Sequence, residues 1–213
     1  MDSNVIWSNE KKIERTIEAL KKNNMNGYYV KDRYNLIELI KDIVDEGSIV
    51  SCGGSMTLFE TGVIDHLRSG RYDFLDRYKE GITREEITNI FRQAFLSDAY
   101  FVSSNAVTEN GELYNVDGTG NRVAAMLYGP DKVIVICGAN KIVKDVDEAI
   151  KRNREKSAPI NAKRLDRKTP CAKVGYCMDC SSPERICNEY TLIRRQNVSD
   201  RIHVIFLNEN IGY

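Results

Sequence analysis

Apolar residues along the first quarter of the chain follow helical and extended spacings in turn. Ile13, Ile17 and Leu20 recur at spacings of four and three among charged residues, which predicts an amphipathic helix over 9–23 with Ser8 as its N-cap. The next three apolar groups predict a strand at 27–30, a helix at 36–44 and a buried strand at 48–52. This alternation of helices and strands predicts a parallel sheet that helices cover on both faces.

The same alternation continues toward the last residues, with longer polar connections. The segment 56–95 has a mostly helical pattern, and Thr83, followed by an acidic first turn, predicts the start of a helix within it. The remaining pattern predicts, in order, a strand at 99–103, a hairpin turning at Asn110-Gly111, a helix at 123–127, a strand at 131–137, a helix at 143–156 and a final strand at 201–207. Together these elements predict an α/β fold.

One segment breaks the pattern. Residues 169–188 are rich in Cys, Pro and Ser and carry few large apolar side chains. This composition predicts a loop that is held by something other than a hydrophobic core. We interpret 169–188 as an insertion before the last strand of a single domain that spans 1–213.

Charge and composition exclude several classes of protein. The 31 basic and 31 acidic residues cancel, so no whole-chain field attracts nucleic acid or anionic lipid, and we expect neither as a partner. The first dozen residues lack the apolar stretch of a secretory signal, and the strongest apolar run, at 133–137, is far shorter than the roughly 20 residues of a membrane span. We therefore expect a cytoplasmic protein whose six cysteines stay reduced.

A turn with two glycines follows the predicted strand at 48–52. In open α/β folds, ligands bind beyond the carboxyl ends of the strands. Gly53 and Gly54 would let backbone N–H groups approach an anion, while Ser55 and Thr57 would add hydroxyl donors. The same residues also fit a plain tight turn with Ser55 as an N-cap, and two glycines alone do not distinguish these interpretations.

A dense polar run occupies 103–122, directly after the next predicted strand. A partly desolvated Glu109 or Asp117 could serve as a general base, and Arg122 could pair with a substrate carboxylate. The amide side chains that could orient the substrate are Asn105, Asn115 and Asn121. Because Asn, Asp and Gly also form ordinary turns, that interpretation stays open.

Four thiols lie within seventeen residues, as Cys171-x5-Cys177-x2-Cys180-x6-Cys187. A short loop can wrap four thiolates around one metal centre, so the spacing predicts a metal site. An iron–sulfur cluster, such as 4Fe-4S, and zinc both fit, and the spacing does not choose between them. A disulfide pair and unligated thiols are the remaining interpretations.

Several isolated residues receive simpler interpretations. Lys141 follows the predicted strand at 131–137, where a lysine can bind an anion or end the turn in solvent. Trp7 is expected to anchor the N-terminal helix, and His203 to point outward from the final strand. Cys52 and Cys137 fit small buried apolar groups.

Three blocks of sequence are GGSMTLFETG at 53–62, the run at 104–143 that begins SNAVTENGELYNVDGTGNR, and TPCAKVGYCMDCSSPERICN at 169–188. Together they resemble the LUD-domain family of lactate-utilisation proteins (LutC/YkgG-like). The resemblance implies a three-layer α/β sandwich of the NagB/RpiA/CoA-transferase type with a mostly parallel sheet. It also implies that a substrate anion sits on Gly53, Gly54 and Ser55, with Glu109 as acid or base.

The same resemblance implies a role in a multi-subunit system that oxidises L-lactate to pyruvate, in which a partner protein carries iron–sulfur clusters. Many members lack the four-cysteine segment, which suggests a subgroup that binds its own metal. We therefore expect a protein that helps to oxidise a small hydroxy acid and holds a metal centre. No NAD is expected, because neither glycine turn completes a G-x-G-x-x-G fingerprint.

Two alternatives stay open at this point. The first is a non-redox isomerase or transferase acting on a small carboxylate or phosphate metabolite, with Glu109 as base and a structural zinc at the cysteines. The second is a binding module that senses an acid or the redox state without turnover. The sequence leaves open whether catalysis takes place in this chain and whether the chain forms a homo-oligomer.

Overall fold

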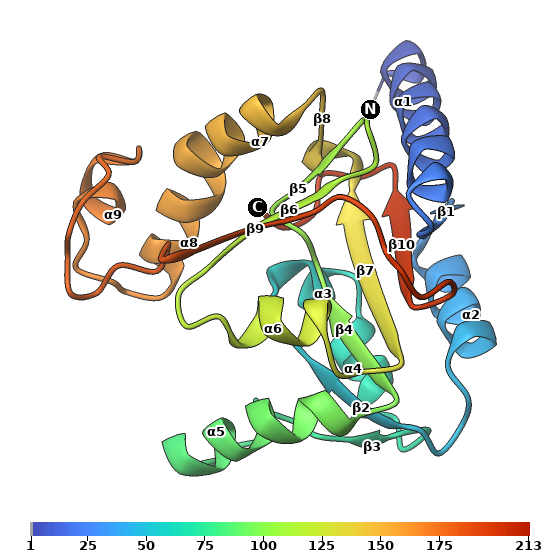
Figure 1. The fold of residues 1–213 in the computed structure, drawn as a ribbon, viewed down its shortest axis with the longest axis horizontal. Helices are drawn as coiled ribbons and strands as arrows, with labels where there is room; N and C mark the ends of the chain where they lie inside the picture. The colour runs from blue at the N-terminus through green and yellow to red at the C-terminus, as the bar shows by residue number, and fades with distance from the viewer. Residues whose placement is uncertain (1) are drawn as a thin grey trace.

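A parallel six-stranded sheet forms the centre of the protein (Figure 1). The computed structural model describes residues 2–213, and within them the strand order is β1-β10-β7-β4-β2-β3, with every neighbouring pair parallel. The strands are β1 (Asn26–Val30), β2 (Ile49–Cys52), β3 (Asp73–Phe74), β4 (Ala99–Val102), β7 (Lys132–Gly138) and β10 (Ile202–Leu207). The predicted α/β fold with a mostly parallel sheet is confirmed.

Both faces of this sheet are buried, which explains the unbroken apolar runs of its central strands. Along β7, Val133 and Val135 enter one core, whereas Ile134 and Ile136 enter the core on the opposite face. The first face is covered by α1 (Ser3–Lys22) and α6 (Asn121–Leu127), and the second by α2 (Arg33–Ile43), α3 (Met56–Glu60) and α4 (Val63–Leu67). Helices on both sides of the sheet give the three-layer sandwich that the family resemblance implies.

A second, four-stranded sheet lies between the first core and α7 (Val146–Arg152). Its order is β8-β5-β6-β9, with bounds β5 (Ala106–Thr108), β6 (Leu113–Asp117), β8 (Ile142–Val143) and β9 (Glu189–Ile193). Val107 and Leu113 pack toward the large sheet, while Ala106 and Tyr114 pack toward α7. The predicted hairpin is the β5–β6 pair. The sequence pattern missed β9, so two strands, β9 and β10, follow the cysteine-rich segment.

The predicted helix at 143–156 is longer and less regular than expected. After α7 the chain makes a π-helical turn, η3 (Asn153–Ser157), and continues as α8 (Ala158–Arg164). Pro159 does not end the helix, and it lies in the first turn of α8, directly after the π-helical turn. A short helix, α9 (Pro170–Val174), then opens the cysteine-rich segment at the edge of the molecule (Figure 1).

The remaining helical segments are α5 (Arg84–Gln93), η1 (Ala94–Leu96) and η2 (Ala139–Lys141). Thr83 caps α5 in a reciprocal capping box with Glu86, as the sequence predicts. No helix within residues 2–213 combines the length and the apolar character needed to cross a membrane.

Three expectations about single residues are wrong. The first helix begins at Ser3 with Asp2 as its cap, so Ser8 lies inside the helix. Trp7 does not anchor that helix, because it is 61% exposed. His203 is buried rather than outward, because both faces of the sheet are covered, and its ring nitrogens face the Tyr28 hydroxyl and the Asp200 carbonyl.

Candidate functional site

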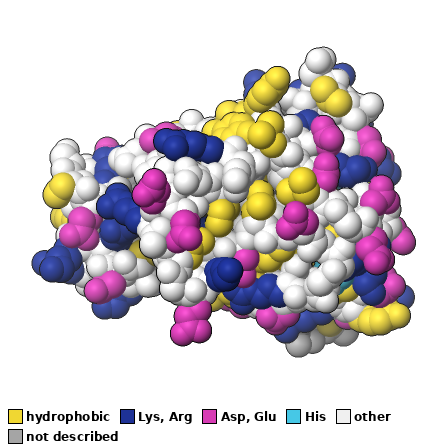
Figure 2. Space-filling view, turned by 90° about the horizontal axis from the view of Figure 1, so that it is seen from below, with side chains coloured by type: hydrophobic (Ala, Val, Ile, Leu, Met, Phe, Trp, Pro, Cys, Tyr) yellow, Lys and Arg dark blue, Asp and Glu magenta, His cyan; other side chains and the backbone are white. Residues whose placement is uncertain are grey.

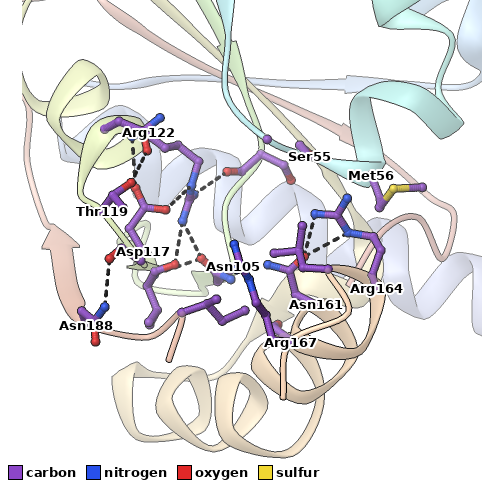
Figure 3. A pocket seen from close by; sticks show the side chains of 18 of the residues that line it. Ser55, Met56, Asn105, Asp117, Thr119, Arg122, Asn161, Arg164, Arg167 and Asn188 are labelled. Atoms are coloured by element: carbon purple, nitrogen blue, oxygen red, sulfur yellow. Dashed lines mark hydrogen bonds and ion pairs between the residues drawn. The ribbon is translucent and has the colours of Figure 1, made fainter. Parts of the chain in front are cut away.

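A cavity of about 620 Å³ opens at the carboxyl ends of β2, β4 and β7 (Figure 3). Ligands of parallel α/β sheets bind at this end of the strands. The lining comes from the turn after β2, the loop after β4, the β6–α6 connection, Lys141, the α8 region, residues 183–188 and Tyr213. Segments from most of the chain therefore converge on one site.

Lys141 is the most unusual group in this cavity. Its side chain is buried, and its Nζ donates to Thr57 Oγ1 at 2.9 Å and to Ser103 Oγ at 2.8 Å. Within residues 2–213 it makes no ion pair with a carboxylate. Burial is the main reason that the pKa of Lys141 falls to about 8. The interpretation of Lys141 as a solvated turn residue is wrong, because η2 directs it inward beneath Gly212.

Arg122 lines the cavity, but all of its donors are occupied within the protein (Figure 3). Its Nε donates to Asp117, its Nη1 to Asn115 and to the Ser103 carbonyl, and its Nη2 to Asn105 and to the Val116 carbonyl. A guanidinium has five N–H donors. Arg122 therefore holds the cavity wall together and has no donor left for the substrate carboxylate that the sequence assigned to it.

The predicted polar residues divide by what their side chains contact. Asp117 and Asn105 line the cavity, although both also hold Arg122, and Asp117 accepts the backbone N–H groups at the start of α6. Asn121 lines it too, and its side chain accepts from Thr119. Asn115 is fully buried behind the wall, and its Nδ2 has no partner among the described residues.

Part of the glycine turn after β2 lines the cavity. Gly54, Ser55 and Thr57 line the cavity, and the Ser55 side chain makes no capping bond. Gly53 has a packing role instead, because a Cβ there would lie 3.0 Å from Arg122 Cγ and 3.1 Å from the Tyr100 hydroxyl.

Glu109 lies outside the cavity. It sits at the β5–β6 turn, where its carboxylate receives Nε and Nη2 of Arg15 on α1. The prediction that Glu109 serves as the acid or base of the site therefore has no support from its position. Its place in a polar run suggested a shared pocket, but the β5–β6 hairpin carries it to the far end of the small sheet.

Most of the positive charge of the cavity comes from residues that no sequence motif marks. Seven basic side chains and two acidic ones line the cavity. On the face drawn in Figure 2, basic and acidic side chains are interspersed. The arginines that the sequence did not single out for the site are Arg77, Arg84, Arg164, Arg167 and Arg185. Such a surplus favours an anionic ligand.

The four cysteines lie beside this cavity but do not form a ligand set. Cys187 is buried, whereas Cys171, Cys177 and Cys180 are half-buried, and all four are free thiols. Cys177 and Cys180 are close enough to Cys187 to contribute to the raised pKa of its thiol, which is due mainly to burial. Within residues 2–213, no three His, Cys, Asp or Glu side chains are placed to hold one metal ion.

Arg185 organises the cysteine-rich segment. Its guanidinium donates to the carbonyls of Cys180 and Cys187, to Asp179 and to the Tyr190 hydroxyl. Because residues 183–186 also line the cavity, the cysteine-rich segment and the cavity share a wall.

Comparisons with known proteins agree with this architecture. A family model described as the LUD domain matches residues 13–207. The crystal structure of a DUF162 family protein from Deinococcus radiodurans covers 93% of this chain and 98% of its own, with a TM-score of 0.54 and 12% identity. That identity establishes the fold alone. No curated protein matches this chain.

Two further solved structures are similar over about half of the chain. They are eIF2B beta and eIF2B delta from Chaetomium thermophilum, with TM-scores of 0.37 and 0.36 and identities of 16% and 18%. They cover 55% and 56% of this chain, and 44% and 50% of their own.

Proposed function

We propose that this chain, which belongs to the LUD-domain family, binds a small hydroxy acid such as L-lactate at Lys141 and takes part in its oxidation. The observation that carries the proposal is the buried ammonium group of Lys141, which lines the cavity without a carboxylate partner. Burying a charge without an ionic partner costs free energy of folding. Proteins retain such unfavourable groups at functional sites.

The contacts of Lys141 suit it to hold an anion. An ammonium has three N–H donors, and two of them go to Thr57 and Ser103. The two hydroxyls fix the direction of the side chain, so the third donor is held ready for a carboxylate oxygen or for the oxygen of a keto acid product. A pKa of about 8 also lets Lys141 exchange a proton near neutral pH.

Oxidation of a hydroxy acid to a keto acid releases two electrons and two protons. The O–H and C–H bonds break as the C=O bond forms. We assign both electrons to an iron–sulfur partner protein, as the family relationship suggests, and both protons to solvent, one of them by way of Lys141. A non-redox isomerase or transferase reaction on an anionic metabolite is the second candidate. The basic surplus of the cavity favours it equally, but its base would have to be Lys141 or Asp117 rather than Glu109.

Calorimetric titration with L-lactate and with pyruvate tests the binding proposal. We expect saturable binding at pH 7 and a loss of at least about 30-fold in affinity for Lys141→Met, because a charge-assisted hydrogen bond to a desolvated anion is removed. Lys144→Met is the matched control, because Lys144 is exposed, lies three residues after Lys141 and is outside the cavity. Equal binding by wild type and Lys141→Met would overturn the proposal.

The pH dependence of this binding has a defined sign. Lys141 is charged below its pKa of about 8 and neutral above it. Affinity is therefore expected to be constant below about pH 7 and to fall by about tenfold per pH unit above the pKa. The same titrations repeated from pH 6 to pH 9.5 measure this, and an affinity that rises with pH would contradict it.

We also propose that the four cysteines bind zinc or an iron–sulfur cluster. The support is their spacing and the closeness of Cys177 and Cys180 to Cys187. Since the thiols do not converge as they stand, binding would require the segment to rearrange, and no step of the chemistry above passes through the metal.

Elemental analysis and an absorption spectrum of anaerobically purified protein test this second proposal. We expect bound zinc, or iron with a broad band near 400 nm, and loss of the metal from Cys177→Ser, Cys180→Ser. Cys52→Ser is the control, because Cys52 is buried in the core of the large sheet. Metal-free wild-type protein would count against the site.

A further inference from the structure

Arg77 is a second cationic group of the cavity that has no anionic partner. Within residues 2–213 its guanidinium makes no ion pair and no hydrogen bond, and its Nε is buried without a partner. It is held in place by two rings, with its Cζ 4.5 Å from the ring centre of Phe91 and 5.3 Å from that of Tyr78. Such stacking positions a guanidinium while leaving its N–H groups free in the plane.

Arg77 and Lys141 both lie beside the turn at 53–57. A Cβ built on Gly54 would lie 3.7 Å from Arg77 Nη1, while Lys141 contacts Thr57, three residues further along. Because three residues span at most about 10 Å, Gly54 and Thr57 lie on one short stretch of backbone. A Cβ at Gly54 would therefore make ordinary van der Waals contact with the Arg77 guanidinium, which places this guanidinium beside the turn.

We propose that the cavity takes a ligand with two anionic groups, one at Lys141 and the second at Arg77, separated by a short carbon chain. The ligand class is a dicarboxylate or a phosphorylated hydroxy acid. The inference rests on the proposed function in assigning the first carboxylate to Lys141, and it adds the second group. The cavity volume of about 620 Å³ exceeds what a three-carbon hydroxy acid fills.

Titration with three probes tests the inference, using L-lactate, L-malate and 3-phosphoglycerate. We expect wild type to bind at least one of the two dianions 10-fold or more tightly than L-lactate. Tighter binding of malate identifies a second carboxylate, and tighter binding of phosphoglycerate identifies a phosphate. Arg77→Met is expected to abolish this advantage and to weaken the binding of the dianions by a larger factor than that of L-lactate.

Arg71→Met is the matched control. Arg71 also has a buried Nε without a partner and lies 5.6 Å from the centre of a tyrosine ring, that of Tyr72, but it pairs with Glu46 and lies outside the cavity. Thermal unfolding of both variants shows whether each is folded. Arg71→Met is expected to keep the preference for the dianion.

The outcomes separate the two proposals. If L-lactate binds through Lys141 and neither dianion binds more tightly, the second subsite is wrong and the proposed function stands. An equal loss of all three probes in Arg77→Met also overturns the subsite. If a dianion binds in a manner that depends on Arg77 but not on Lys141, the proposed function fails while the Arg77 site stands. If no probe binds wild type, both are overturned.

Discussion

Lys141→Met is expected to raise the free energy of unfolding at pH 7 by about 2 kcal/mol while it removes ligand binding. The pKa of Lys141 is lowered from 10.5 to about 8, and each pKa unit corresponds to about 1.4 kcal/mol of penalty on the charged form. The hydroxyls of Thr57 and Ser103 lose a donor in the variant, which offsets about a third of that gain. Urea unfolding of wild type and variant measures the difference.

The dependence of this effect on pH identifies its source. Between about pH 8 and pH 10.5 the unfolded chain keeps the proton of Lys141 and the native protein does not, so stability from this group rises with pH. The advantage of Lys141→Met is therefore expected to shrink between pH 7 and pH 9.5. Lys144→Met, at an exposed position, should match wild type at both pH values. A variant less stable than wild type at pH 7 would show that Lys141 contributes to folding instead of opposing it.

Arg122→Met is expected to lower the free energy of unfolding by about 4 kcal/mol. Removing one member of a buried charged network leaves the other members without partners, and such losses are typically about 3–5 kcal/mol. Here the Asp117 carboxylate and the Asn115 and Asn105 side-chain oxygens all lose a donor. We expect ligand binding to weaken as well, because the wall loses its shape.

Arg15→Met is the appropriate comparison for Arg122→Met. Arg15 also pairs with a carboxylate, that of Glu109, but its side chain is 60% exposed. Exposed ion pairs contribute about 0–1 kcal/mol, so this variant should unfold close to wild type in urea. Similar losses for the two variants would mean that Arg122 does not organise a buried network.

The fold could be predicted from the sequence because a strand that is buried on both sheet faces has an unbroken apolar run. Val133 to Cys137 form an unbroken apolar run, and a parallel strand covered on both sides requires one. β9 was missed because it alternates half-buried and exposed residues, with Glu189 and Thr191 in a polar pattern, and it owes its pairing to β6. At the N-terminus, Ser8 and Asp2 are both residue types that cap helices. The pattern predicted the cap at Ser8, whereas Asp2 caps the helix.

Residues that line the cavity could be predicted only where a local sequence motif indicates them. The glycine turn at 53–57 has such a motif, and its cavity position follows from the strand before it. Lys141 has none, because its burial depends on Gly212, about 70 residues later in the chain, whose built Cβ would lie 3.2 Å from its Nζ. Arg122 was assigned a ligand because a sequence does not reveal how many acceptors the fold will place around a guanidinium.

The position of β10 in the sheet affects how the chain is made. β10 lies between β1 and β7, yet within residues 2–213 it follows every other strand in the sequence. Until residues 202–207 leave the ribosome, β1 has no neighbour in the sheet, and β7 presents an unpaired apolar edge. Unpaired strand edges in a nascent chain are sites of aggregation, and non-local strand pairing is slow. Messages truncated shortly before codon 202 should therefore yield insoluble chains that depend on chaperones, even though every cavity-lining residue except Tyr213 has already been translated.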